Sequence, residues 1–136
     1  MSFTHSVRTC LRKYATFSGR ARRSEYWYFM IFASLVEALA AVVFSNIFPA
    51  TVTIDGTSFS LITLAVSLFL TLPRLAVTVR RLHDIGKSGW ALCINFIPVI
   101  GQIIFFIWCL RDSEPRFNRF GPDPKRFPMA MLFQNA

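Results

Sequence analysis

The chain has 136 residues, of which 54% are hydrophobic, and it contains fifteen phenylalanines at a mean hydropathy of +0.46. This composition is too apolar for an ordinary soluble domain of that length and indicates a membrane protein. A formal net charge of +8 is also typical of nucleic-acid binding, but no basic-aromatic binding module is visible, and none of the cations lies between Ser24 and Pro73. We therefore expect a single membrane domain over residues 1–136 and no nucleic-acid partner.

Residues 1–18 form the first predicted element, an amphipathic helix. Apolar side chains recur at steps of three or four while the basic residues fall on another face. Such a helix either lies on the membrane surface or packs on loops of its own chain, since both arrangements use the same pattern. Ser18 and Gly19 end the element. The apolar stripe contains Phe3, Val7, Cys10, Leu11, Tyr14 and Phe17.

Two apolar runs follow that are long enough to span a bilayer. Residues 26–48 begin with an aromatic belt at Tyr26 and would extend about 35 Å as a helix. Residues 49–58 carry no cation and predict a short turn at Asp55 and Gly56 on the far side of the membrane. Residues 59–79 return the chain, and Pro73 predicts a bend near the end of this second span.

The third apolar run, residues 90–110, has two possible topologies. Its length suits a single crossing, but Pro98 to Gly101 place turn-forming residues at its middle. A single crossing would also put five cations of the following tail on the far side, against the positive-inside rule. We favour a broken helical hairpin whose short arms re-enter the side they came from, with its turn buried in protein.

Residues 111–136 are predicted to form an extended tail, because four prolines interrupt any helix. The hairpin topology places this tail, like the N-terminus, in the cytoplasm. The fold class predicted is therefore all-α: a membrane helical bundle with an interfacial N-terminal helix, two long spans and a third, broken helical hairpin.

Four segments of the sequence resemble those of a known family. They are residues 17–27 (FSGRARRSEYW), 80–90 (RRLHDIGKSGW), 98–101 (PVIG) and 118–124 (NRFGPDP). In these motifs and their order the chain is similar to the bacterial inner-membrane family called domain of unknown function 805. The resemblance covers nearly the whole chain and implies a small multi-pass inner-membrane protein without an assigned reaction. Glu37, Arg74 and residues 114–117 depart from the usual pattern of that family.

The ends of the two spans carry charges that we expect to pair. Glu25 begins the first span and Arg80 and Arg81 end the second, so antiparallel packing puts them at one depth, where a bidentate ion pair fits. Arg20, Arg22 and Arg23 add cations at the same level. These outnumber the nearby carboxylates, which predicts spare capacity for an anionic lipid headgroup.

Residues 80–90 form a polar block that we interpret as a short membrane loop. Gly86 is the expected helix stop and Ser88 the N-cap of the next segment. His83 and Asp84 are adjacent and do not face each other on a helix, and no nucleophile stands at a recognisable spacing. We expect neither an enzyme nor a bound cofactor, and the scattered histidines and cysteines do not make a metal site.

Glu37 lies near the middle of the first span, where an ionised carboxylate is costly. It is either a proton or ion site or, as we favour, a protonated carboxyl bonded to a neighbouring helix. Arg74 is offset from it by about 10 Å in depth, so we expect Arg74 to snorkel to phosphates rather than to pair with Glu37.

The turn-forming residues of the tail predict that it docks on the 80–90 block, with Asp123 as the carboxylate facing its cations. The sequence thus favours a module that binds anionic lipids, a membrane partner or a second copy of itself. A small transporter or channel subunit that uses Glu37 is the alternative. The predicted binding residues are Arg20, Arg23, Glu25, Arg80, Arg81, His83, Asp84, Lys87, Asn118, Arg119 and Asp123.

Overall fold

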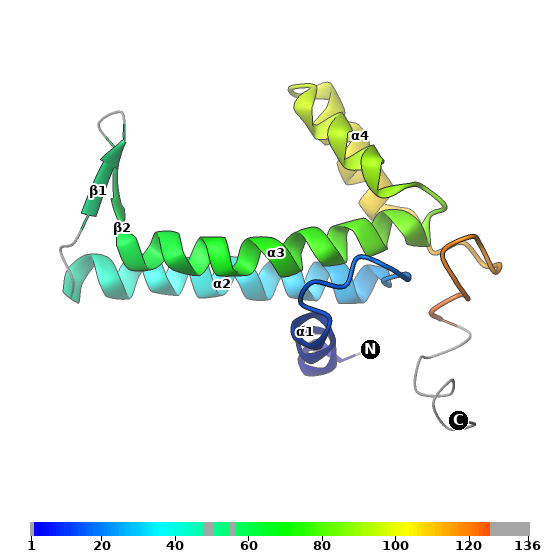
Figure 1. Ribbon diagram of the computed structural model, residues 1–136, viewed down its shortest axis with the longest axis horizontal. Helices are drawn as coiled ribbons and strands as arrows, with labels where there is room; N and C mark the ends of the chain where they lie inside the picture. Colours follow the sequence, from blue (N-terminus) through cyan, green and yellow to red (C-terminus); the bar gives the residue numbers. More distant parts are fainter. Residues whose placement is uncertain (1, 48–50, 55–56, 126–136) are drawn as a thin grey trace.

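The computed structural model describes residues 2–47, 51–54 and 57–125 of the chain. Two long helices, α2 (Arg23–Ile47) and α3 (Leu61–Asp84), lie side by side and antiparallel (Figure 1). A short helix, α1 (Phe3–Arg12), is seen nearly end-on beside them and therefore crosses the pair. A third helical segment extends obliquely from the end of α3. The described fold is helical, as predicted, apart from one small β-hairpin.

Both long helices are apolar enough to cross a membrane. The most apolar 18-residue stretch of α2 has a mean hydropathy of 2.0 and that of α3 one of 1.9. Their outward faces expose large apolar side chains such as Leu35, Leu39 and Leu68, each more than 60% exposed. A helix pair that leaves this much apolar surface uncovered needs lipid or another apolar partner around it.

The boundaries of α2 and α3 correct the sequence prediction at both ends. Helix α2 begins at Arg23 rather than at residue 26, and residue 48 lies outside the described part of the chain. Helix α3 runs to Asp84 rather than to residue 79, so half of the presumed 80–90 loop is helix. The helix continues because its last charged side chains are neutralised by ion pairs. The glycine that stops the helix is the predicted one. Gly86 lies just beyond the last helical residue with φ 74°, and Lys87 N donates to Leu82 O.

On the far side, α2 and α3 are joined through a two-stranded antiparallel hairpin. Strand β1 (Thr51–Ile54) pairs with β2 (Thr57–Ser60), with Thr51 opposite Ser60 and Ile54 opposite Thr57. A turn was expected here, and the β-branched residues of β1 explain why the backbone extends into strands. The predicted turn residues 55–56 lie outside the described part of the chain.

The third segment is a helical hairpin. A 3-10 helix, η1 (Gly89–Phe96), leads away from α3, and α4 (Ile100–Leu110) returns. Ser88 caps η1 as predicted by accepting from Trp90 N at 3.2 Å. The arms pack so closely that a Cβ on Gly101 would lie 1.8 Å from Ile94 O. Lys87 lies 4.2 Å from the Trp108 ring, which holds the two ends of the hairpin together.

The small core lies where α1 meets the long helices and joins them to α4. It is built from Cys10, Ala21, Tyr26, Phe29, Ala33, Leu70, Val77 and Cys109. Helix α1 contributes its buried face of Ser6 and Cys10, and the Phe3 ring packs on Tyr28 at 5.8 Å. This core therefore fixes α1 near the end of the pair where α2 begins and α3 ends, and the charged residues gather at that end.

Candidate functional site

Five charged side chains are buried together where α2 begins and α3 ends. Each is at most 6% exposed. Because three guanidinium groups meet two carboxylates, the group depends on dense hydrogen bonding to offset the cost of desolvation. We call Arg20, Glu25, Arg80, Arg81 and Asp84 the charge cluster.

Arg20 is the hub of the charge cluster. Its Nε donates to Asp84 Oδ1 at 3.0 Å, and its two Nη groups donate to four backbone carbonyls at 2.6 to 3.3 Å. All five guanidinium donors are therefore used. Arg20 consequently has no donor left for a lipid headgroup, which corrects the spare capacity predicted for it. The four carbonyls belong to Asp84, Glu114, Arg116 and Gly121.

Arg81 joins the cluster to the end of the helical hairpin. Its Nη1 donates to Asp84 Oδ2 at 2.5 Å, and its other nitrogens donate to the carbonyls of Cys109 and Arg111. Ser113 Oγ adds a further hydrogen bond to Asp84 Oδ2 at 2.5 Å. The Asp84 carboxylate thus accepts from two arginines and a serine.

Glu25 pairs with Arg80, as the sequence predicted, but not bidentately. Arg80 Nη1 donates to Glu25 Oε1 at 2.5 Å, and Cys10 Sγ donates to the same oxygen at 3.7 Å. Within the described residues, Arg80 Nε and Nη2 have no hydrogen-bond partner. Burial and the Glu25 carboxylate raise the pKa of the Cys10 thiol from 9.0 to about 12, so Cys10 is a neutral donor here. Burial and then the Arg80 charge lower the pKa of nearby Lys13.

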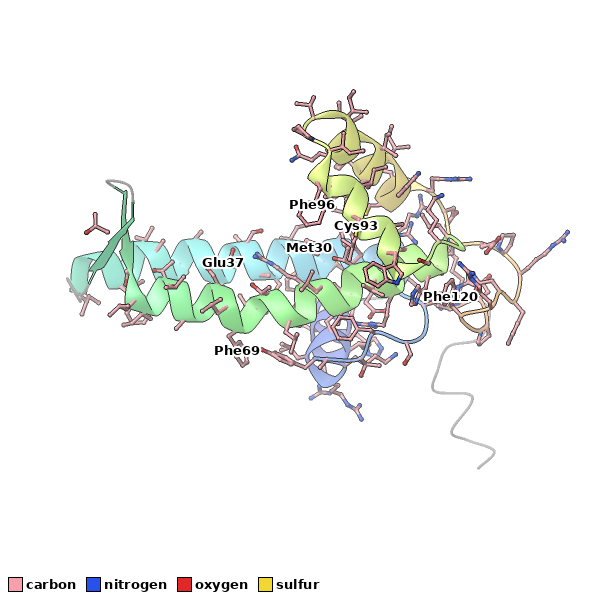
Figure 2. All side chains as sticks on the ribbon, turned by 45° about the horizontal axis from the view of Figure 1, so that its top comes forward. Met30, Glu37, Phe69, Cys93, Phe96 and Phe120 are labelled. Carbon is pink, nitrogen blue, oxygen red and sulfur yellow. The ribbon has the colours of Figure 1, made fainter. Side chains whose placement is uncertain are left out.

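The tail docks on the end of α3, as predicted. Asn118 Nδ2 donates to His83 O at 3.0 Å, and Glu114 N donates to Asp84 O at 3.1 Å. The Phe120 ring stacks on the His83 ring with centroids 3.8 Å apart, while Arg119 lies 4.7 Å from the Phe120 centroid. Phe120 is visible at this end in Figure 2. His83 Nδ1 lies 3.2 Å from Gly19 O, so this nitrogen carries the proton.

The remaining predicted binding residues lie around the cluster. Asp123 is buried, and its Oδ1 accepts from Lys125 N at 2.8 Å. Arg23 is exposed on its side chain and pairs with Asp112 at 3.2 Å, and Lys125 contacts the same carboxylate. The hydrogen bonds from Lys125 and from Ser113 N lower the pKa of Asp112. The ammonium group of Lys87 lies over the Trp108 ring in a cation–π contact.

Glu37 and Arg74 form an ion pair halfway along α2 and α3, and the expectation that Arg74 snorkels instead is wrong. Arg74 donates from Nη1 and Nη2 to the two Glu37 oxygens at 2.7 and 2.9 Å. The expected offset of about 10 Å counts from a second span that ends at residue 79. Because α3 runs to Asp84 and α2 begins at Arg23, the two Cα atoms differ in depth by only about 6 Å. Side chains lean toward the N-terminus of their own helix, so in antiparallel helices the two leans converge. Figure 2 shows Glu37 between the two helices.

Sequence reasoning missed several residues that complete the site. Ser113 donates to Asp84 and Cys10 to Glu25. Arg22, which the sequence places among the cations at this level, donates through Nε to Pro124 O at 2.5 Å. No motif distinguished them, because a lone serine or cysteine and a backbone carbonyl have no sequence signature.

Chemically, the cluster holds three guanidinium groups and two carboxylates in buried ion pairs. Among the described residues, no three His, Cys, Asp or Glu side chains gather to hold a metal. The three cysteines are free thiols. Apart from Arg80, whose Nε and Nη2 have no partner among the described residues, the cations with unused donors lie on exposed surface around the cluster.

An apolar antiparallel helix pair, closed at one end by buried arginine and carboxylate groups, defines a small helical membrane protein. The chain belongs to the family described as "Protein of unknown function (DUF805)", whose sequence model matches residues 14–122. This confirms the resemblance seen in the four sequence segments.

Two curated relatives from Escherichia coli strain K12 match over most of their length. "Inner membrane protein YhaI" is 37% identical over 116 residues, which are 85% of this chain and 91% of the relative. "Inner membrane protein YhaH" is 36% identical over 118 residues, 87% of this chain and 94% of the relative. Both names support an inner-membrane localisation. No solved structure matches the chain.

Proposed function

We propose that the protein is a membrane-embedded interaction module that gathers anionic lipid around its basic end. The observation that carries this proposal is a set of exposed arginines around the charge cluster. In the described part of the chain they form no ion pair with a carboxylate. Each such cation near a membrane surface contributes about 1 kcal/mol of attraction to anionic lipid. The exposed arginines are Arg8, Arg12, Arg111, Arg116 and Arg119.

The charge cluster supports this role by fixing where those arginines lie. Arg20 and Arg81 tie the tail and the hairpin to the end of α3 through buried hydrogen bonds. The exposed cations of the tail are therefore presented on a rigid surface rather than on a solvated linker. In this proposal Arg20, Arg80, Arg81 and Asp84 position the surface, and the exposed arginines contact phosphates.

The topology that suits this role has α2 and α3 spanning the inner membrane with the basic end in the cytoplasm. Helix α1, which crosses the pair near Tyr28, lies in the interface, and the η1–α4 hairpin dips into the same leaflet. Support for the hairpin as a membrane-inserted element comes from Trp90 and Phe96, which are 83% and 87% exposed.

Cysteine accessibility in intact cells tests the topology. In a background with the three native cysteines replaced by serine, single cysteines are placed at Thr53, in β1, and at the exposed Phe117. An impermeant maleimide added from the periplasm should label Thr53→Cys and leave Phe117→Cys unlabelled until the inner membrane is opened. Periplasmic labelling of Phe117→Cys would instead mean that residues 90–110 cross the membrane once.

Lipid analysis tests the binding itself. Protein extracted in mild detergent from vesicles of equimolar phosphatidylglycerol and phosphatidylcholine should retain more phosphatidylglycerol. Replacing the five exposed arginines by glutamine should abolish the enrichment, whereas five lysines should preserve it. High salt should weaken the enrichment. Equal retention of both lipids by the wild type rules out the proposal, and a co-purifying protein or second copy would favour scaffolding.

A transporter or channel subunit built on Glu37 is the weaker candidate. Both Glu37 oxygens accept from Arg74, so the carboxylate is neutralised by a protein cation. A proton or ion carrier would have to break this pair in every cycle, at a cost of several kcal/mol.

A further inference from the structure

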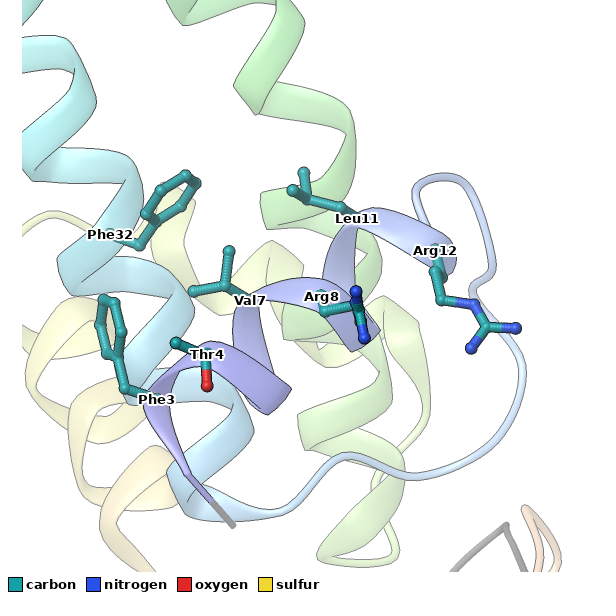
Figure 3. A pocket seen from close by; sticks show the side chains of 7 residues that line it. All are labelled: Phe3, Thr4, Val7, Arg8, Leu11, Arg12 and Phe32. Carbon is teal, nitrogen blue, oxygen red and sulfur yellow. The ribbon is translucent and has the colours of Figure 1, made fainter.

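Two adjoining hollows lie where α1 crosses the helix pair, and they share Leu11 and Phe32. The first lies against α1 and is lined in part by Arg8 and Arg12 (Figure 3). The second runs between α2 and α3 toward the far side of the pair. Since Leu11 and Phe32 border both, the two hollows adjoin, and we treat them together as one groove with a basic end and an apolar end. We call it the α1 groove.

The apolar end of the α1 groove has the size and lining of an acyl-chain site. Its volume is about 560 Å³, within the usual range of small-molecule sites. From Leu70 to Leu61 it follows α3 for about 13.5 Å, through the half of the helix that lies beyond Arg74 and leads to the β-hairpin. Its lining is wholly apolar: Leu11, Phe32, Val36, Leu61, Ile62, Ala65, Val66, Phe69 and Leu70.

The basic end of the α1 groove has two cations and lacks a counter-charge. Arg8 and Arg12 are four residues apart on α1, so they lie on one side of the helix. Like charges at this spacing repel each other, and α1 contains no acidic residue to offset them. Figure 3 shows both arginines beside the apolar side chains of Phe3, Val7 and Leu11. An anion between Arg8 and Arg12 would turn this repulsion into attraction.

From this arrangement we infer that the α1 groove binds one molecule of an anionic phospholipid. The phosphate lies between Arg8 and Arg12 and accepts hydrogen bonds from both guanidinium groups, and one acyl chain lies along α3 from Leu70 toward Leu61. The inference rests on the proposed function and makes it specific. The proposed function describes a general attraction of anionic lipid to the basic end, whereas this inference describes one site that holds one lipid molecule.

The chemistry of the groove disfavours other occupants. A peptide would bring backbone polar groups into an apolar lining that offers them no hydrogen bonds. Inorganic phosphate would use the arginines and leave the apolar end empty. A zwitterionic lipid carries its own ammonium group, which competes with Arg8 and Arg12 for the phosphate.

Native mass spectrometry tests the inference on the full-length protein in detergent. Phosphatidylglycerol and phosphatidylcholine of equal chain length are titrated separately, and the one-to-one complexes are counted. The wild type should show a single tight phosphatidylglycerol site. Arg8→Gln with Arg12→Gln should weaken it about 30-fold, since each cation contributes about fivefold. Inorganic phosphate at the same concentration should not displace the lipid.

Two control pairs separate this site from general electrostatics. Arg111→Gln with Arg116→Gln removes two exposed charges outside the groove, so it should reduce the general phosphatidylglycerol enrichment while the tight one-to-one complex stays. Ala65→Trp fills the apolar end without changing charge and should abolish the complex, whereas Ala41→Trp on an exposed, non-lining position of α2 should not.

Equal weakening by the two arginine pairs would overturn the specific site while leaving the proposed function standing. Retention of the tight complex in Ala65→Trp would do the same. Absence of any preference for phosphatidylglycerol in the wild type would overturn both. Circular dichroism of each variant verifies that the helices are intact, so that a lost complex reports on binding.

Discussion

Arg20 Nε donates to Asp84 Oδ1 at 3.0 Å, and both side chains are at most 1% exposed. The pair joins the segment before α2 to the last residue of α3, and the other donors of Arg20 reach three carbonyls of the tail. One side chain thus connects segments from three parts of the chain.

The first prediction concerns the shape of that side chain. Arg20→Lys keeps the charge beside Asp84, but a single ammonium cannot reach all five acceptors. We expect the free energy of unfolding in detergent to fall by about 2–4 kcal/mol and trypsin to cleave the tail faster at Arg119 and Lys125. Arg111→Lys, at an exposed side chain, should stay within about 0.5 kcal/mol of the wild type. An Arg20→Lys protein as stable as that control would contradict the hub role.

The second prediction concerns the ion pair halfway along α2 and α3. Glu37→Gln and Arg74→Gln each leave one uncompensated charge in an apolar setting, and each should destabilise the protein by about 2–4 kcal/mol. The double variant should be more stable than the sum of the single effects predicts. Unfolding by sodium dodecyl sulfate, analysed as a double-mutant cycle, measures this coupling. A coupling below about 0.5 kcal/mol would mean that the pair does not hold the helices together.

The third prediction concerns the thiol at Cys10. Because burial raises its pKa to about 12, Cys10 should resist maleimide while the exposed Cys93 reacts in the folded protein. The raised pKa of Cys10 also determines how the stability of the fold changes with pH. The neutral thiol contributes fully below pH 9 and loses that contribution as pH rises from 9 toward 12.

Thermal unfolding of the wild type and of Cys10→Ser measures this pH dependence, because the serine hydroxyl does not titrate in this range. The difference in stability between wild type and variant should shrink between pH 8 and pH 10.5. Rapid labelling of Cys10 before unfolding, or a difference independent of pH, would show that this thiol is not buried against Glu25.

The fourth prediction compares two phenylalanines of the tail. Phe120 stacks on His83, whereas Phe117 is 77% exposed. Phe120→Ala should lower the free energy of unfolding by about 1–2 kcal/mol through lost burial and stacking, and Phe117→Ala should have almost no effect. The two variants differ only in position, so equal effects on unfolding would exclude the stack as the anchor of the tail.

Much of the fold follows from local patterns in the sequence. Apolar length predicts α2 and α3, Gly86 and Ser88 predict where one helix stops and the next begins, and the turn at Pro98 predicts the hairpin. The pairing of Glu25 with Arg80 was also predictable, because antiparallel helices bring their ends to one depth. These predictions succeeded because the residues concerned lie at the ends of helices, and the helix ends determine which residues become neighbours.

The partners of Arg20 could not be predicted in the same way. Four of its five hydrogen bonds end on backbone carbonyls, which every residue carries, so the sequence does not mark them. The Glu37–Arg74 pair was missed for a different reason. Residue counting locates Cα atoms, whereas the direction in which long side chains lean decides whether their ends meet.

The distance in sequence between the partners of Arg20 has a consequence for how the protein is made. Arg20 binds carbonyls 94 to 101 residues further along the chain. Both long helices are therefore synthesised while the Arg20 guanidinium still lacks these partners. The ribosome must also complete residues 114–121 before the cluster can close. A chain interrupted within α4 would lack these carbonyls and leave the Arg20 guanidinium incompletely bonded, so completion of the tail is a condition for closing the cluster.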